Sequence, residues 1–230
     1  MSGLFTVCRP IFDRSQRVAA YELPYKWIDD TDTTAGGGAS DSGNAVAILS
    51  ALLGLGLARI TDVETVLVKV SEAVVLAGVG YVKDPERVVL ELAHTVRPTP
   101  DVVGRCRALQ DRGFRIALDN FTERAKAGPL LWIADLVTVD VLDAGDRLGE
   151  VAGRLMALDV PTLAKRVEHA AMQRRCEALG FELFQGSYPT CPNVLHGAGP
   201  NGLGIMVRSP LLPAGSEEST ASTRRSPCMR

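Results

Sequence analysis

Residues 87–119 read RVVLELAHTVRPTPDVVGRCRALQDRGFRIALD, and this stretch decides the fold. It holds two short β-branched runs, typical of strands, on either side of a segment whose apolar residues recur at helical spacing. The runs are Arg87–Leu92 and Arg115–Asp119, and the apolar helical positions are Val102, Cys106 and Leu109. Gly113 follows the helical segment, as glycine commonly does just beyond a helix. The stretch predicts a strand, a helix and a second strand, the unit that builds parallel sheets.

The same alternation extends in both directions along the chain. Further strand-like runs are Thr65–Val70, Asp135–Val141 and Pro161–Val167. Further apolar helical faces are formed by Leu148, Val151, Leu155 and Leu158, and by Met172, Cys176 and Leu179. Gly180 follows the last of these helices. Six or more such units in one domain favour a closed (β/α) barrel of the TIM type over an open sheet.

Composition places the chain among soluble globular proteins. Its 230 residues carry a net charge of -2, and 46% of them are hydrophobic, which excludes a wholly disordered chain. We expect one barrel domain over residues 1–208, with a flexible Gly-rich loop at 29–43, and a disordered tail over residues 209–230. The longest apolar stretch, Asn44–Ala58, is shorter than the roughly 18 residues of a membrane span, so a buried helix is predicted.

The ends and the cysteines favour a cytoplasmic location. The first residues lack the basic and apolar regions of a signal peptide. The five cysteines form no CxxC pair, so we expect reduced thiols that pack mostly as small core hydrophobes. No basic patch precedes the tail, which argues against direct nucleic-acid binding.

Polar residues recur where the predicted strands end. They are Glu22, Lys69, Glu91, Asp119, Asn120, Asp140, Lys165, Glu168 and Gln185. In barrels of this kind the functional site lies at the carboxyl ends of the strands, so a shared site at one rim is predicted. The alternative is that each strand end is simply polar because it meets solvent.

The order of these motifs resembles that of the EAL domain. Seven segments occur in sequence: YEL, VLVKVS, VVLEL, RIALDNF, LVTVDV, TLAKRVE and ELFQGSY. The opening RPIFDRSQRVAAYELPYK is similar to the EAL half of EAL–HDOD proteins, and the resemblance spans about Phe5 to Pro192. It implies an α/β fold, a modified TIM (β/α) barrel with its first strand antiparallel. The family comprises phosphodiesterases that cleave cyclic di-GMP with two Mg²⁺ or Mn²⁺ ions, and relatives that only bind cyclic di-GMP or proteins.

The resemblance also assigns a role to each motif position. Six positions keep the family residue: Glu22, Glu91, Asp119, Asp140, Glu168 and Gln185. Lys69 stands in place of a metal-ligating asparagine, and Asn120 in place of the second aspartate. Thr138 replaces the lysine that orients the catalytic water, and Lys165 replaces a glutamate of the metal centre. Lys26 stands where the family has an arginine that grips a phosphate.

Two of these replacements change the sign of the charge. An ammonium group has only donors and cannot ligate a cation. We therefore expect Lys69 and Lys165 to pair with Glu22, Glu91, Asp119 or Glu168 and to fill the metal site. No metal, no other cofactor and no catalytic residue is expected, and the chain is interpreted as a catalytically inactive EAL-like signalling protein.

Several alternatives stay open at this point. The chain could act through a protein partner, or bind cyclic di-GMP without metal through Glu22, Lys26, Glu91, Asp119, Asp140, Glu168 and Gln185. The opposite reading is an active phosphodiesterase with an altered Mg²⁺ or Mn²⁺ shell. EAL domains often form dimers through helices beside the paired-aspartate loop. The segment Thr122–Pro129 departs from the family's length and sequence there. A homodimer therefore stays open.

Overall fold

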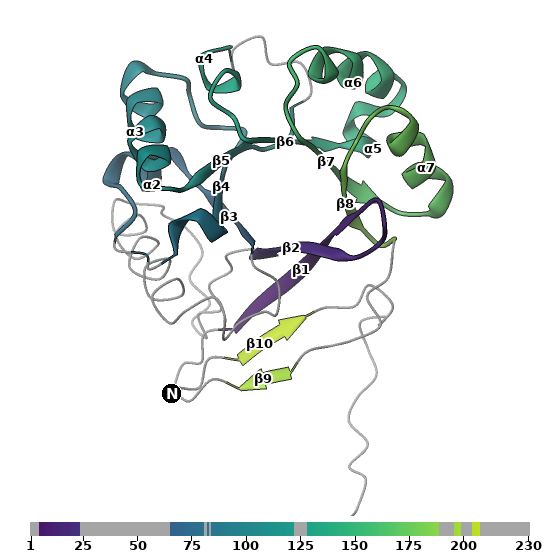
Figure 1. Ribbon diagram of the computed structural model, residues 1–230, viewed down its shortest axis with the longest axis horizontal. Coiled ribbons are helices and arrows are strands. Elements are labelled where there is room, and N and C mark those ends of the chain that lie inside the picture. The colour runs from purple at the N-terminus through teal and green to yellow at the C-terminus, as the bar shows by residue number, and fades with distance from the viewer. Residues whose placement is uncertain are drawn as a thin grey trace, which may run out of the picture.

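The strands close into an eight-stranded barrel with helices around its outside (Figure 1). The computed structural model describes residues 5–23, 65–80, 82, 84–121, 128–188, 196–198 and 204–207. The barrel strands are β1 (Phe5–Asp13), β2 (Val18–Leu23), β3 (Val66–Val70), β4 (Val88–Leu92), β5 (Arg115–Leu118), β6 (Leu136–Asp140), β7 (Thr162–Val167) and β8 (Leu183–Gly186). Their order is β2-β3-β4-β5-β6-β7-β8-β1, and the pairing of β1 with β2 completes the circle.

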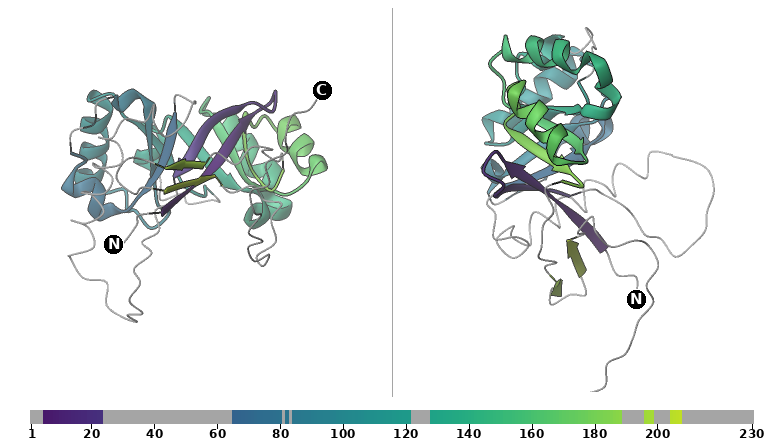
Figure 2. Two further views of the ribbon diagram at one scale, coloured as in Figure 1. Left: turned by 90° about the horizontal axis from the view of Figure 1, so that it is seen from below. Right: turned by 90° about the vertical axis from the view of Figure 1, so that its right-hand side faces the viewer.

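The first strand runs against the others. Strands β2 to β8 pair in parallel, whereas β1 is antiparallel to both β2 and β8. This confirms the predicted barrel with a reversed first strand. The start of β1 extends beyond the barrel and pairs with β10 (Gly204–Val207), which in turn pairs with β9 (His196–Ala198). Figure 2 shows these two short strands beside the barrel, next to the start of β1.

Helices follow the strands, and those at 100–111, 148–156 and 170–178 lie where the sequence predicts them. They are α2 (Glu72–Ala77), α3 (Pro100–Asp111), α4 (Gly128–Leu131), α5 (Val141–Ala144), α6 (Leu148–Met156) and α7 (Ala170–Ala178), with 3-10 turns η2 (Pro85–Arg87) and η4 (Gly145–Arg147). The hydroxyl of Thr99 caps α3 by accepting a hydrogen bond from Val102 N. Gly113 follows α3 with a φ of 100°, a left-handed conformation that glycine adopts without strain. Cys106 and Cys176 are buried free thiols, as predicted.

An apolar layer fills the lower part of the barrel interior. Its members form one packed cluster, with one residue from each strand: Ile11, Ala20, Leu67, Val89, Ala117, Leu136, Leu163 and Leu183. A second and larger cluster lies between the barrel and the helices, and it includes Val102, Leu155 and Phe181. Stacked layers contributed by successive strands are the usual interior of a (β/α) barrel.

Several sequence predictions lie outside the described residues. These are the Gly-rich loop at 29–43, the apolar helix within 44–58, Lys26, most of the segment 122–129 and the tail at 209–230. None of the helices in the described ranges has the length and apolar character needed to cross a membrane.

Candidate functional site at the barrel mouth

A ring of polar side chains lies directly above the apolar layer. Side chains alternate along a strand, so the residue two positions nearer the barrel mouth faces the same interior. Each strand, or the residue just beyond it, supplies one member: Arg9, Glu22, Lys69, Glu91, Asp119, Thr138, Lys165 and Gln185. We call this set the charged ring. Parallel neighbours are in register, for example Lys69 with Glu91 and Lys165 with Gln185.

Lys165 lies among three carboxylates of the charged ring. Its Nζ is 2.6 Å from Oε1 of Glu91, 3.0 Å from Oε1 of Glu22 and 3.6 Å from Oδ1 of Asp119. The Lys165 side chain is 13% exposed, and those of Glu91, Asp119 and Glu22 are 0%, 7% and 8% exposed. One ammonium therefore neutralises charge contributed by three different strands, in a setting where desolvation makes an unpaired charge expensive.

Lys69 pairs with the third acid from the other side. Its Nζ lies 2.5 Å from Oδ2 of Asp119, and His94 Nδ1 lies 3.9 Å from the same oxygen. Lys69 and His94 are about half exposed, at 44% and 51%, so they stand at the opening of the barrel. Asp119 is thus held between a buried ammonium and a half-exposed one.

Glu22 on β2 contacts the ring members from β8 and β1. Its Oε2 accepts a hydrogen bond of 3.2 Å from Gln185 Nε2 and lies 3.7 Å from Arg9 Nη1. Arg9 comes from the reversed strand β1, which is why the parallel strand pattern of the sequence did not reveal it. The signal was present, because Arg9 precedes the interior residue Ile11 by two positions.

Thr138 connects the charged ring to the loop after β5. Its hydroxyl oxygen accepts a hydrogen bond from Asn120 N at 3.1 Å and donates its proton toward Glu91 Oε1 at 3.1 Å. The Thr138 side chain is fully buried. The hydroxyl therefore positions Glu91, whose other oxygen, Oε2, has no hydrogen-bond partner among the described residues.

The protonation states follow from burial and from these pairings. Burial alone would lower the pKa of Lys165, but the charges of Glu91 and Glu22 outweigh it and raise the pKa, so the ammonium stays protonated. Burial would likewise raise the pKa of Asp119, yet the hydrogen bond from Lys69 and the nearby Lys165 hold it below its ordinary value. Burial raises the pKa of Glu91, and Lys165 opposes that rise.

The remaining predicted residues lie around the charged ring. Asn120 and Asp140 lie at the rim and contact each other, since Asn120 Oδ1 accepts a hydrogen bond from Asp140 N at 3.4 Å. Glu168 is exposed beyond the end of β7 and is not among the acids that contact Lys69 or Lys165. The position of Lys26 lies outside the described residues.

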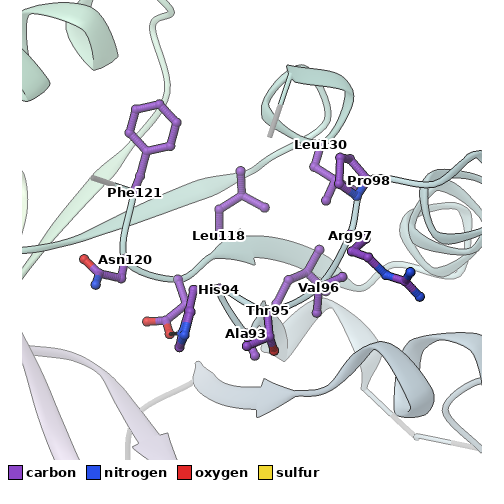
Figure 3. A pocket seen from close by; sticks show the side chains of 12 residues that line it. Ala93, His94, Thr95, Val96, Arg97, Pro98, Leu118, Asn120, Phe121 and Leu130 are labelled. Carbon is purple, nitrogen blue, oxygen red and sulfur yellow. Dashed lines mark ion pairs between the residues drawn. The ribbon is translucent and has the colours of Figure 1, made fainter. Parts of the chain in front are cut away.

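A small cavity lies beside the charged ring, between the loops that follow β4 and β5. Its volume is about 130 Å³, and the described residues that line it are Leu92 to Pro98, Leu118 to Phe121 and Leu130. Figure 3 shows His94 and Asn120 on one side of this lining and Arg97 on the other. Pockets for small-molecule ligands usually measure roughly 300–1,000 Å³, so this cavity is smaller than a typical ligand pocket.

The oxygens of the charged ring, as placed, do not fit a divalent cation. A Mg²⁺ or Ca²⁺ ion needs several oxygen ligands directed at one point. Here Oε1 of Glu22, Oε1 of Glu91 and Oδ1 of Asp119 are directed at the Lys165 ammonium. Within the described part of the chain, no group of three or more His, Cys, Asp or Glu side chains is arranged to hold a metal.

A solved structure shares this barrel fold. The Bacillus subtilis YkuI protein, with an EAL domain, in complex with substrate c-di-GMP and calcium, matches 80% of this chain and 54% of its own with a TM-score of 0.61 and 16% identity. The chain folds as an EAL-type barrel. At this identity the likeness establishes the fold of the EAL-type barrel and not its activity.

Two curated proteins are similar in sequence to this EAL-type barrel. The uncharacterized protein YuxH of Bacillus subtilis (strain 168) is 24% identical over 201 residues, which cover 84% of this chain and 48% of YuxH. The cyclic di-GMP phosphodiesterase CdgJ of Vibrio cholerae is 31% identical over 113 residues, which cover 48% of this chain and 26% of CdgJ. The chain thus spans less than half the length of either relative. No family model matches the sequence.

Proposed function

We propose that this EAL-type barrel does not hydrolyse cyclic di-GMP and acts in signalling by binding, with another protein as its principal partner. One observation carries the proposal: the Lys165 ammonium lies within 3.6 Å of Glu22, Glu91 and Asp119. Metal-dependent phosphodiester hydrolysis needs cations at such carboxylates, both to activate water and to stabilise charge on the phosphate. A protonated amine supplies neither a coordinated water nor an open ligand position.

The charge balance of the ring supports this proposal. Its three carboxylates, Glu22, Glu91 and Asp119, face three cations, Arg9, Lys69 and Lys165. A metal-binding cluster of carboxylates carries excess negative charge when the metal is absent, and like charges at close range repel. The charged ring has no such excess, so it needs no divalent ion for stability.

Thr138 supports the proposal independently. The resemblance to EAL phosphodiesterases places a water-orienting lysine at this position. Here the threonine hydroxyl is committed to Asn120 N and Glu91 Oε1, both at 3.1 Å. A hydroxyl used in this way neither carries positive charge nor has a proton left to orient an attacking water.

A protein partner is favoured by an exposed aromatic residue. Trp132 lies between α4 and β6 and leaves 78% of its surface exposed. Tryptophan is enriched at the energetically important centres of protein interfaces. Trp132 lies close to the amino-terminal end of β6, away from the mouth, so such contact does not require an occupied mouth.

Metal-free binding of cyclic di-GMP is the second candidate, favoured by the cations at the mouth. The side chains of Arg9, Lys69 and His94 are 59%, 44% and 51% exposed. Charge-assisted hydrogen bonds from such groups to phosphate oxygens are strong. The YkuI complex contains c-di-GMP and calcium, which makes cyclic di-GMP the ligand to test first.

Calorimetric titration of cyclic di-GMP separates these readings. The protein is titrated in EDTA and again in excess Mg²⁺, and its hydrolytic activity is assayed with Mn²⁺. We expect no linearised product and no dependence of binding on metal. Binding heat in both buffers supports metal-independent binding of cyclic di-GMP. No binding heat in either buffer supports a protein partner. Binding that requires Mg²⁺, or turnover with Mn²⁺, would overturn the proposal.

Partner capture tests the protein-binding reading directly. The wild-type chain and its Trp132→Ala variant are used as baits on the same lysate. Leu142→Ala is the matched control, because Leu142 is also an exposed apolar residue, at 39%. A partner identified by mass spectrometry should be retained by wild type and by Leu142→Ala and lost by Trp132→Ala. Equal retention of the partner by all three baits would show that Trp132 is not part of the interface.

A further inference from the structure

Arg166 occupies an irregular position at the end of β7. The pairing with β8 runs from Lys165 opposite Gln185 to Val167 opposite Gly186, so Arg166 is an extra residue in a β-bulge. Its φ is 59°, in the left-handed region that residues with a side chain rarely adopt. Gly186 permits this bulge, because a Cβ there would lie 2.0 Å from the carbonyl oxygen of Val167.

The bulge directs the Arg166 side chain sideways along the rim. While Lys165 points into the charged ring, the guanidinium of Arg166 contacts the carboxylates of Asp140 and Asp143. These two acids belong to the end of β6 and to α5. The sequence pattern around Lys165 gave no sign of this, because a regular strand would place consecutive side chains on opposite faces.

A second left-handed residue reaches the same two acids from the other side. Asn120 follows β5 and has a φ of 48°. Its Nδ2 donates to Asp143 Oδ2 at 3.2 Å, and its Oδ1 accepts from Asp140 N at 3.4 Å. Asp140 also caps α5, since its Oδ1 accepts hydrogen bonds from Leu142 N and Asp143 N at 3.0 and 3.1 Å.

Strained backbone persists where the surrounding contacts hold it in place, and it concentrates at sites of function. Four non-glycine residues in the described part of the chain have positive φ: Gln16, Asn120, Asp159 and Arg166. Gln16 lies in the exposed β1–β2 turn and Asp159 in the turn after α6. Only Asn120 and Arg166, among these four, join neighbouring strand ends at the barrel mouth.

We propose that Asn120, Asp140, Asp143 and Arg166 form a latch that fixes the ends of β5, β6 and β7 in one conformation without a metal ion. The inference rests on the proposed function, because it assigns to protein side chains the bridging of strand ends that a bound cation would otherwise provide. The latch keeps the mouth pre-formed for the second candidate ligand, cyclic di-GMP, which would bind there and not at Trp132. Arg166 is its central positioning residue, and its half-exposed guanidinium marks where the latch meets solvent.

Substitution by glycine distinguishes the loss of latch contacts from the relief of backbone strain. Glycine relieves a left-handed backbone at any of the four positions, but only at Asn120 and Arg166 does it also remove latch contacts. The test measures amide hydrogen exchange of the full chain in EDTA for Arg166→Gly and Asn120→Gly. Gln16→Gly and Asp159→Gly are the matched controls, and thermal unfolding verifies that each variant is folded.

The amides of Asp140, Leu142 and Asp143 report on the latch because each donates to a latch side chain. We expect exchange there to be at least about fivefold faster in both latch variants and to change less than about twofold in both controls. Arg166→Lys, which keeps the charge but loses the planar fork, should give an intermediate rate. Latch variants as well protected as Gln16→Gly would overturn the inference.

The failure of the proposed function would look different. If Mn²⁺ slows exchange at the mouth of wild type relative to EDTA, the ring binds metal and the proposed function fails. The comparison of Arg166→Gly with Gln16→Gly is made in EDTA throughout. It therefore judges the latch whatever the response to metal.

Discussion

Nζ of Lys165 lies 2.6 Å from Oε1 of Glu91, and the two residues come from strands that are not neighbours in the barrel. The ion pair spans the barrel interior between β7 and β4. It stands above an apolar layer, where water reaches it only from the mouth. Glu91 is fully buried and Lys165 is only 13% exposed, so either one without the other would be strongly destabilising.

Replacing Lys165 by methionine should therefore destabilise the protein by about 3–5 kcal/mol, since it leaves buried carboxylates without their cation. Urea unfolding at neutral pH measures the change. Arg105→Met, on the exposed face of α3, removes a cation from the surface and should change the free energy of unfolding by less than about 0.5 kcal/mol. Equal unfolding midpoints for the two variants would contradict the role of Lys165.

Exchanging both lysines should create a metal-dependent protein. In Lys165→Glu combined with Lys69→Asn, carboxylate and amide oxygens replace the ammonium groups. We expect Mn²⁺ to raise the thermal midpoint of this variant, with about 2.7 kcal/mol of stabilisation when the metal is at 100 times its Kd. Wild type and the control Lys69→Asn alone, which keeps the Lys165 ammonium among the carboxylates, should show no such rise. A comparable Mn²⁺ effect on wild type would argue against the proposed function.

The hydroxyl of Thr138 should stabilise the fold, whereas that of Thr162 should not. Both side chains are fully buried on neighbouring strands. Thr138 bonds Asn120 N and Glu91, while Thr162 Oγ1 has no hydrogen-bond partner within the described residues. Thr138→Val should lower the free energy of unfolding by about 1–3 kcal/mol, because it leaves buried polar groups without a hydrogen-bond partner.

Thr162→Val is the matched control for this change. It removes the same atom from an equally buried site and should leave stability unchanged or slightly higher. Chemical unfolding of the two variants side by side gives the comparison. A loss of the same size in both would mean that valine fits poorly on these strands and that the Thr138 hydrogen bonds contribute little.

Acid should remove the contribution of Asp119. Its pKa is lowered on folding, so its ionised form stabilises the fold above the ordinary carboxyl value of 3.8. This stabilisation is lost as the pH falls below that value and through the lowered pKa. The difference in unfolding free energy between wild type and Asp119→Asn should stay constant from pH 7 to 5 and shrink toward pH 3.

Lys69→Met provides the control for the acid experiment. The hydrogen bond from Lys69 is the largest of the effects that lower the pKa of Asp119. In the Lys69→Met background, the pH dependence of the Asp119→Asn difference should therefore move toward the ordinary value. An unchanged pH dependence would assign the lowered pKa to the charges of Lys165 and His94.

The barrel itself was predictable because strand and helix signals are local. The run Arg87–Leu92 was placed within one residue of β4, and Arg115–Asp119 within one residue of β5. The helix expected to include Leu158 ends at Met156 instead, because Asp159 turns the chain with a φ of 52°. The reversed first strand followed from the motif resemblance and is present in the structure.

The site was predictable only in part. The motif positions identified Lys69, Lys165 and the acids that the two lysines contact. Arg9 was not predicted because its strand runs in the opposite direction. The ring residue of that strand therefore precedes the interior residue instead of following it. Arg166 was not predicted because a bulge interrupts the alternation of side chains between the two faces of the strand. Such irregularities depend on contacts between strands distant in sequence, and no local window contains them.

The apolar layer beneath the ring has a consequence for access. Ile11, Leu67 and Leu163 are at most 1% exposed, so these described side chains close the barrel interior beneath the ring. In the described part of the chain, ions, protons and solutes therefore reach the ring through the barrel mouth. A ligand seated over that opening would isolate the ring from the surrounding solution, and the internal charges would then keep their pairing whatever the salt or metal content outside.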